Sequence, residues 1–261
     1  MSSCDDGRKD GIIPVFKTNF LAIAKRVRSY DDSVLKIMSE IYHALSRGVD
    51  KRKIFMDDKD RFRFIHDLFE FNDEAPADHT SYYYVKSAVI ARQQIERKPR
   101  KLLVDVFAFS LMPNHYHLLL TSRTENGISR FMKKLNMGYS RYFNERYARS
   151  GTLFEGRYKS VLVDNQAYFI HLPYYIHFNP LDLIMPEWRE RKLKDYKKAI
   201  EFLDSYRWSS HLDYMGQKNF PSVTQRDFLL EIFGGEKGYE KQMKNWLGAL
   251  EAKEISDFIL E

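Results

Sequence analysis

The sequence contains a single cysteine, Cys4, among 261 residues. One cysteine excludes an intramolecular disulfide, and no cysteine cluster is present to bind zinc. No run approaches the roughly 20 apolar residues of a membrane-spanning helix. The polar, acidic stretch at residues 2–6 is unlike a signal peptide. These absences predict a cytoplasmic protein.

The excess of positive charge is small. Lysine and arginine number 42 against 36 aspartate and glutamate residues, which gives a net charge of +6. This sum fits an ordinary soluble protein as well as a nucleic-acid binder, so the distribution of the cations matters more than their number. A chain of this length is expected to form one principal domain.

Alternating strand and helix patterns fill the middle of the chain. Hydrophobic spacing predicts strands at residues 41–46, 102–111, 116–121 and 153–163, and helices at 57–71, 127–147 and 165–179. Asp57 and Asp58 form the expected cap region of the first helix, and Pro173 predicts a kink or a division in the third. The predicted organisation is an N-terminal extension at 1–39, a main domain at 40–185 with an insertion at about 73–101, and a basic linker with a helical tail at 186–261.

Two histidines interrupt an apolar strand. His115 and His117 follow the turn residues Pro113 and Asn114, and they precede three leucines. Residues two apart on a strand share one face. A buried imidazole needs a polar partner, and a metal ion is one such partner. The spacing alone is a weak signal, because structural histidine pairs are common.

Several stretches around this hairpin resemble one family. Residues 112–120 are similar to the HUH motif (histidine, bulky apolar residue, histidine) of single-tyrosine transposases, which include small insertion-sequence transposases and REP-associated tyrosine transposases. Further similar stretches occur in the same order, at residues 42–48, 151–159, 175–180 and 208–210. The resemblance extends from about residue 41 to residue 210.

The resemblance implies a fold and an activity. The expected fold is α+β, a ferredoxin-like (RRM-like) antiparallel sheet with helices packed on it, followed by a helical C-terminal tail. The expected function is a DNA transposase or strand transferase that binds single-stranded DNA hairpins. It would cleave and rejoin DNA through a 5′-phosphotyrosine intermediate with Mg²⁺ or Mn²⁺ as cofactor.

The same resemblance assigns the site residues. Tyr175 is the expected nucleophile, in competition with its neighbour Tyr174, and His115, His117 and Asn179 are the expected metal ligands. Tyr175 and Asn179 are four residues apart, so they share one face of a helix. Asparagine is also common at the end of a helix, so the alternative for Asn179 is a purely structural role before Pro180. The candidates for phosphate contacts are Arg47, Lys51, Arg52, Lys53, Arg157 and Lys159.

Two questions stay open at the level of sequence. The alternative function is a domesticated protein that recognises DNA or RNA hairpins without cleaving them. Relatives of this kind include both monomers and homodimers, so the oligomeric state is undecided.

Overall fold

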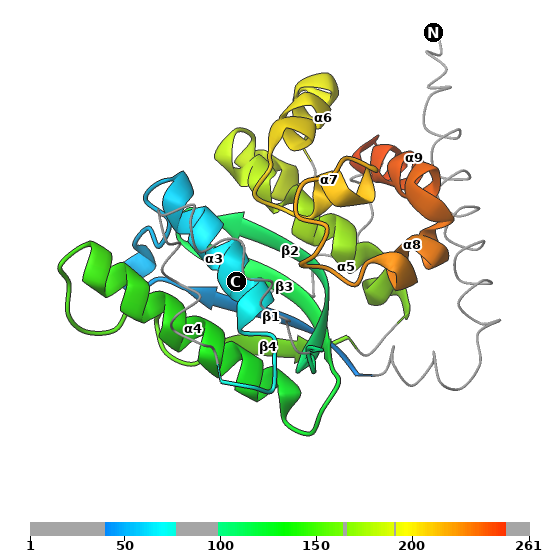
Figure 1. Cartoon of the computed structure of the whole chain (residues 1–261). Helices are drawn as coiled ribbons and strands as arrows, with labels where there is room; N and C mark the ends of the chain where they lie inside the picture. The colour runs from blue at the N-terminus through cyan, green and yellow to red at the C-terminus, as the bar shows by residue number, and fades with distance from the viewer. Residues whose placement is uncertain (1–39, 77–98, 164–165, 191, 249–261) are drawn as a thin grey trace, which may run out of the picture.

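A four-stranded antiparallel sheet forms the centre of the molecule (Figure 1). The computed structural model describes residues 40–76, 99–163, 166–190 and 192–248. The strands are β1 (Ile41–Arg47), β2 (Val104–Met112), β3 (His115–Ser122) and β4 (Lys159–Leu162), in the order β2-β3-β1-β4. Each neighbouring pair is antiparallel. The predicted extension at residues 1–39 and most of the predicted insertion lie outside the described residues.

Two helices complete the ferredoxin-like arrangement. Helix α3 (Asp58–Glu70) connects β1 to β2, and α4 (Gly127–Arg146) connects β3 to β4. Each helix connects two strands that are separated in the sheet by one other strand. The element order strand, helix, strand, strand, helix, strand therefore confirms the predicted fold class.

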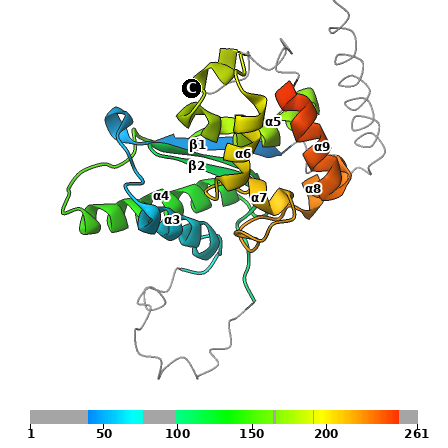
Figure 2. The ribbon, with the colours of Figure 1, turned by 90° about the horizontal axis from the view of Figure 1, so that it is seen from above.

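Both faces of the sheet are covered, which explains why its central strands are almost continuously apolar. Tyr116, Leu118 and Leu120 of β3 belong to a hydrophobic core with α3 and α4. Leu119 belongs to a second core with helix α5 (Gln166–Phe178). Figure 2 shows α3 and α4 together on one side of the sheet. The histidine face of β3 is therefore the face that carries α5.

The C-terminal part is helical, as expected. Its segments are the 3-10 helices η4 (Asn179–Leu183) and η5 (Pro186–Glu190), and the helices α6 (Tyr196–Ser205), α7 (His211–Tyr214), α8 (Asp227–Phe233) and α9 (Gly235–Gly248). Apolar side chains of α8 and α9 share one core with α5. Because of this shared core, the C-terminal helices are integrated with the sheet domain. The predicted domain boundary at residue 186 stays a prediction.

A buried polar network joins these helices to the sheet. His177 of α5 hydrogen-bonds through Nδ1 to the Tyr239 hydroxyl at 2.7 Å and through Nε2 to Ser210 Oγ at 2.7 Å. His211 Nδ1 lies 2.8 Å from the same Tyr239 hydroxyl. The backbone amide of Phe109 in β2 donates to Ser210 Oγ at 2.9 Å. His177 is fully buried and both of its ring nitrogens have partners, so it joins α5 to the C-terminal helices and the sheet.

Two details of the predicted elements are wrong. The strand expected at 153–163 is reduced to Lys159–Leu162. Gly156 has a φ of 144°, and the side chains of Leu153 and Phe154 turn into the core, so the chain leaves the extended path. Helix α5 is also not divided at Pro173, which lies inside one helix, and the alternative of a kink there stays a prediction. The buried apolar side chains on both sides of Pro173 offset the backbone hydrogen bond that proline removes.

No helix within the described ranges is both long enough and apolar enough to span a bilayer.

Asn72 is expected to be a strong determinant of stability. Its Nδ2 donates to the Val104 carbonyl at 2.9 Å, and its Oδ1 accepts from the amides of Leu103 and Val104 at 3.1 and 3.0 Å. Asn72→Ala leaves these buried backbone groups without partners, and we expect a loss of about 3 kcal/mol in the free energy of unfolding. Urea denaturation measures the change. Asn144→Ala, which removes one exposed and one partly buried side-chain hydrogen bond, is the control, and equal losses in both variants would contradict this role.

Candidate active site

The two histidines of the hairpin lie side by side on the α5 face of the sheet. His115 and His117 are both buried, and their ring centroids are 4.9 Å apart. The turn at Pro113 and Asn114 is held by the chain that follows β1, since the amide of Gly48 donates to the Asn114 carbonyl at 2.8 Å. The hairpin therefore starts β3 in a fixed position, and the strand alternation places both imidazoles on one face.

A third histidine, His43 of β1, orients His117. His43 Nε2 lies 2.9 Å from His117 Nδ1, and the two rings are stacked at 5.1 Å between centroids. His117 Nε2 is buried and has no hydrogen-bond partner among the described residues. If His117 Nδ1 carries the proton and donates it to His43, the lone pair of Nε2 is left available for a ligand.

Burial keeps this group of imidazoles neutral. It lowers the pKa of His43 to about 4. Burial, with a smaller contribution from the charge of Arg47, lowers the pKa of His115 to about 4. Burial and then the neighbouring histidines hold the pKa of His117 well below its usual value. Neutral imidazole is the form that binds metal ions, so the site is prepared for a ligand at neutral pH.

The tyrosine of helix α5 that faces the histidines is Tyr175. Its ring centroid lies 6.3 Å from those of His43 and of His117. Tyr174 instead stacks on Tyr239 at 5.1 Å and lies in the core formed by the C-terminal helices. Burial raises the pKa of Tyr174 well above its usual value. Adjacent positions on a helix point about 100° apart, which is why only one of the two reaches the sheet.

Asn179 is tied to Tyr175 through Arg189. The Asn179 Nδ2 donates to the Tyr175 carbonyl at 2.9 Å, and its Oδ1 accepts from Arg189 Nη2 at 2.8 Å. Arg189 Nη1 donates to the Tyr175 hydroxyl at 2.7 Å. The structure thus brings His115, His117 and Tyr175 into one group, with Asn179 joined to it through Tyr175 and Arg189.

The donor atoms present suit a divalent cation only in part. The described residues contain no group of three His, Cys, Asp or Glu side chains arranged to hold a metal ion. The unpartnered Nε2 of His117 and the neutral state of both imidazoles fit a metal ligand pair. The Asn179 oxygen already accepts from Arg189, but a carbonyl oxygen has two lone pairs. Two imidazoles and an amide oxygen would leave further positions for water and for a phosphate oxygen.

The candidate phosphate-binding cations differ in where they lie relative to the histidines. Arg47 lies opposite His115 in the register of β1 and β3, and Lys159 lies opposite Leu45. Cross-strand partners share a face of the sheet, so both cations lie on the histidine side. Lys51, Arg52 and Lys53 are in the connection after β1, where the Lys51 carbonyl accepts from Asn114 Nδ2 at 3.2 Å. Arg157 is exposed in the loop before β4. Their contact with DNA stays a prediction.

The sequence interpretation missed two residues of this group. His43 lies in one of the similar stretches, but the sequence predicts no role for it, because its contact with His117 depends on the pairing of β1 with β3. Arg189 falls within the basic linker and helical tail predicted at 186–261. In the sequence, Arg189 is one of several cations in a short segment. No local pattern predicts its hydrogen bond to Tyr175.

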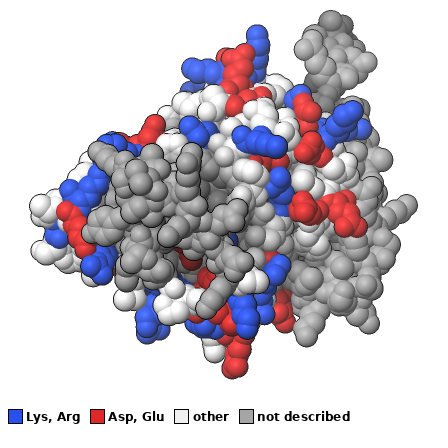
Figure 3. Space-filling view, in the orientation of Figure 1, with Lys and Arg blue, Asp and Glu red and all other residues white. Residues whose placement is uncertain are grey.

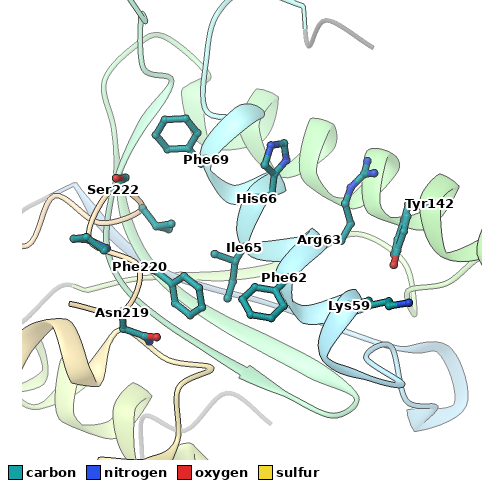
Figure 4. Close-up of a pocket in the computed structure, with 12 residues that line it drawn as sticks. Lys59, Phe62, Arg63, Ile65, His66, Phe69, Tyr142, Asn219, Phe220 and Ser222 are labelled. Atoms are coloured by element: carbon teal, nitrogen blue, oxygen red, sulfur yellow. The ribbon is translucent and has the colours of Figure 1, made fainter. Parts of the chain in front are cut away.

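Other surface features lie away from the histidines. A shallow groove on the α3 and α4 side is lined by Phe62, Phe69 and Tyr142 and by the loop at 219–223 (Figure 4). It lies against α3, on the opposite face of the sheet from Tyr175. On the face shown in Figure 3, lysines and arginines alternate with acidic side chains over the described residues, in keeping with the modest net charge.

Comparison with known proteins finds similarity to one family and to one solved structure. Residues 83–179 match the family described as "Transposase IS200 like". A solved structure of a REP-associated tyrosine transposase bound to a REP hairpin is similar to this chain, with a TM-score of 0.42 and 11% sequence identity. The similarity covers 73% of this chain and 87% of that one. No curated protein is significantly similar to the chain.

The family match includes the histidine hairpin and ends at Asn179. It therefore contains His115, His117 and Tyr175, which the fold brings together. Over residues 83–179, the chain is therefore similar to the IS200-like transposase family.

Proposed function

We propose that the chain is a metal-dependent single-tyrosine DNA transposase that binds single-stranded DNA hairpins and transfers strands through a 5′-phosphotyrosine. One observation carries the proposal. The Tyr175 hydroxyl receives a hydrogen bond from Arg189, and its ring lies beside His117, whose buried Nε2 has no partner among the described residues. Phosphodiester cleavage needs a nucleophile, a positive charge near the phosphate and a ligand for the metal ion. Tyr175, Arg189 and His117 Nε2 are the candidates for these three roles.

The reaction follows from these groups. Tyr175 Oη forms a bond to the scissile phosphorus and loses its proton, while the bond from phosphorus to the 3′ oxygen breaks and that oxygen leaves as a 3′-OH. The covalent intermediate keeps the energy of the phosphodiester. A second 3′-OH attacks it, releases Tyr175 and rejoins the strand, so no nucleotide cofactor is consumed. His115, His117 and Asn179 would hold Mg²⁺ or Mn²⁺, which supplies Lewis-acid polarisation of the phosphate when bound.

The direct test is a covalent-adduct assay. The protein is incubated with Mn²⁺ and single-stranded hairpins taken from the DNA that flanks its own gene, and the adduct is mapped by mass spectrometry. We expect a phosphotyrosine at Tyr175 that chelator abolishes. Tight hairpin binding without any adduct would instead support the alternative, a non-cleaving hairpin-binding protein.

DNA binding is expected to depend steeply on salt. Each cation that contacts a phosphate of single-stranded DNA contributes about 0.7 to the slope of log affinity against log salt. Arg47→Gln and Lys159→Gln should each lower the slope by about this amount, because both cations lie on the histidine face. Fluorescence anisotropy over a series of salt concentrations measures the slope. Lys241→Gln on α9 is the control, and a slope that neither Arg47→Gln nor Lys159→Gln changes would contradict these contacts.

A further inference from the structure

Arg189 links two of the groups on which the proposed chemistry depends. Its Nη1 donates to the Tyr175 hydroxyl at 2.7 Å, and its Nη2 donates to Asn179 Oδ1 at 2.8 Å. The same guanidinium lies 5.5 Å from the centroid of the Tyr175 ring. It comes from η5, outside the segment that matches the family.

An aspartate fixes the guanidinium from the other side. Arg189 Nε donates to Asp182 Oδ1 at 2.8 Å, and Nη2 donates to Asp182 Oδ2 at 2.7 Å. Asp182 Oδ1 also accepts from Trp188 Nε1 at 2.6 Å. A bidentate arginine pair has a defined plane and direction. The edge that carries Nη1 is therefore held toward Tyr175 before any substrate arrives.

We propose that Arg189 is a further catalytic residue, which positions the Tyr175 hydroxyl and binds the phosphate that this hydroxyl attacks. The inference rests on the proposed function. A phosphorus atom in position for attack lies about 3 to 3.5 Å from the nucleophilic oxygen. Because Nη1 is 2.7 Å from the same oxygen, the non-bridging oxygens of that phosphate come within reach of the guanidinium.

The chemistry suits arginine in particular. The guanidinium stays charged, transfers no proton and presents several donors in one plane. It can therefore keep its bond to Asp182, orient the Asn179 amide and stabilise negative charge that grows on the phosphate. A lysine ammonium is a single point charge on a flexible stem. Arg189→Lys is accordingly expected to restore only part of the rate.

The test measures single-turnover adduct formation with the hairpin probes over a range of DNA concentrations. Arg189→Ala is expected to lower the maximal rate about 100- to 1,000-fold, while the half-saturating DNA concentration changes by less than about threefold, since one phosphate contact is lost among many. Asp182→Asn keeps the arginine but loosens its anchor, and we expect a smaller loss, about tenfold. Arg123→Ala, which breaks a surface pair with Asp105, is the matched control.

Added guanidinium ion separates catalysis from folding. Millimolar guanidinium should restore part of the rate of Arg189→Ala, because the free cation can occupy the vacated position, and should leave Tyr175→Phe inactive. A merely structural role would show no such rescue. A normal maximal rate for Arg189→Ala, or a rate loss without rescue, would overturn this inference. If the unaltered chain forms no adduct, the proposed function itself fails and the inference fails with it. An adduct that persists in Tyr175→Phe would assign the nucleophile to another residue and would overturn this inference alone.

Discussion

Tyr175→Phe is expected to abolish the covalent adduct, with a loss of roughly four orders of magnitude or more, as for the removal of other enzymatic nucleophiles. The substitution removes the oxygen that would attack phosphorus and keeps the ring against His43, His117 and Trp188. Hairpin binding should change little, because the ring and the surrounding cations remain. The measurement is the fraction of labelled DNA that migrates with the protein under denaturing conditions.

Tyr174→Phe provides a matched control from the next position in the chain. It removes one hydroxyl, which donates to Gln242 Oε1 at 3.2 Å, from a fully buried ring. This variant should form the adduct at the normal rate. An adduct that persists in Tyr175→Phe and maps to Tyr174 would keep the class of enzyme and overturn the assignment of the nucleophile.

His117→Ala is expected to have the second largest effect, a loss of more than about 100-fold in Mn²⁺-dependent adduct formation, beyond what outer-shell partners of metal ligands usually show. The variant removes the buried Nε2 that lacks a partner among the described residues. Mn²⁺ binding itself, measured by electron paramagnetic resonance, should weaken in parallel. Thermal melting checks that the variant still folds.

Two other histidines calibrate this result. His43→Ala removes the ring that orients His117, so a loss of about 10- to 100-fold is expected. His66→Ala alters an exposed side chain of α3 that is paired with Glu70, and it should have no effect. Full Mn²⁺-dependent activity in His117→Ala would show that this histidine is not a ligand.

Local patterns accounted for most of the framework. The alternation of β3, the turn at Pro113 and Asn114 and the cap at Asp57 each depend on residues close together in the chain. The cap is seen directly, since Asp57 Oδ1 accepts from the amide of Asp60 at 3.1 Å. Errors arose where long-range packing overrode a local preference. Helix α5 continues through Pro173 because its apolar side chains are buried against the sheet and the C-terminal helices.

The amino-acid sequence by itself determined the resemblance to single-tyrosine transposases, the two histidines on one strand face and the shared helix face of Tyr175 and Asn179, because each follows from a short motif or a fixed helical or strand period. Only the tertiary structure decided that His43 orients His117, that Tyr174 stacks on Tyr239 of α9, and that Arg189 donates a hydrogen bond to Tyr175. These contacts join residues from separate elements, or a helix to the segment beyond its end. Their formation depends on strand pairing and on the packing of the C-terminal helices, which no local periodicity specifies.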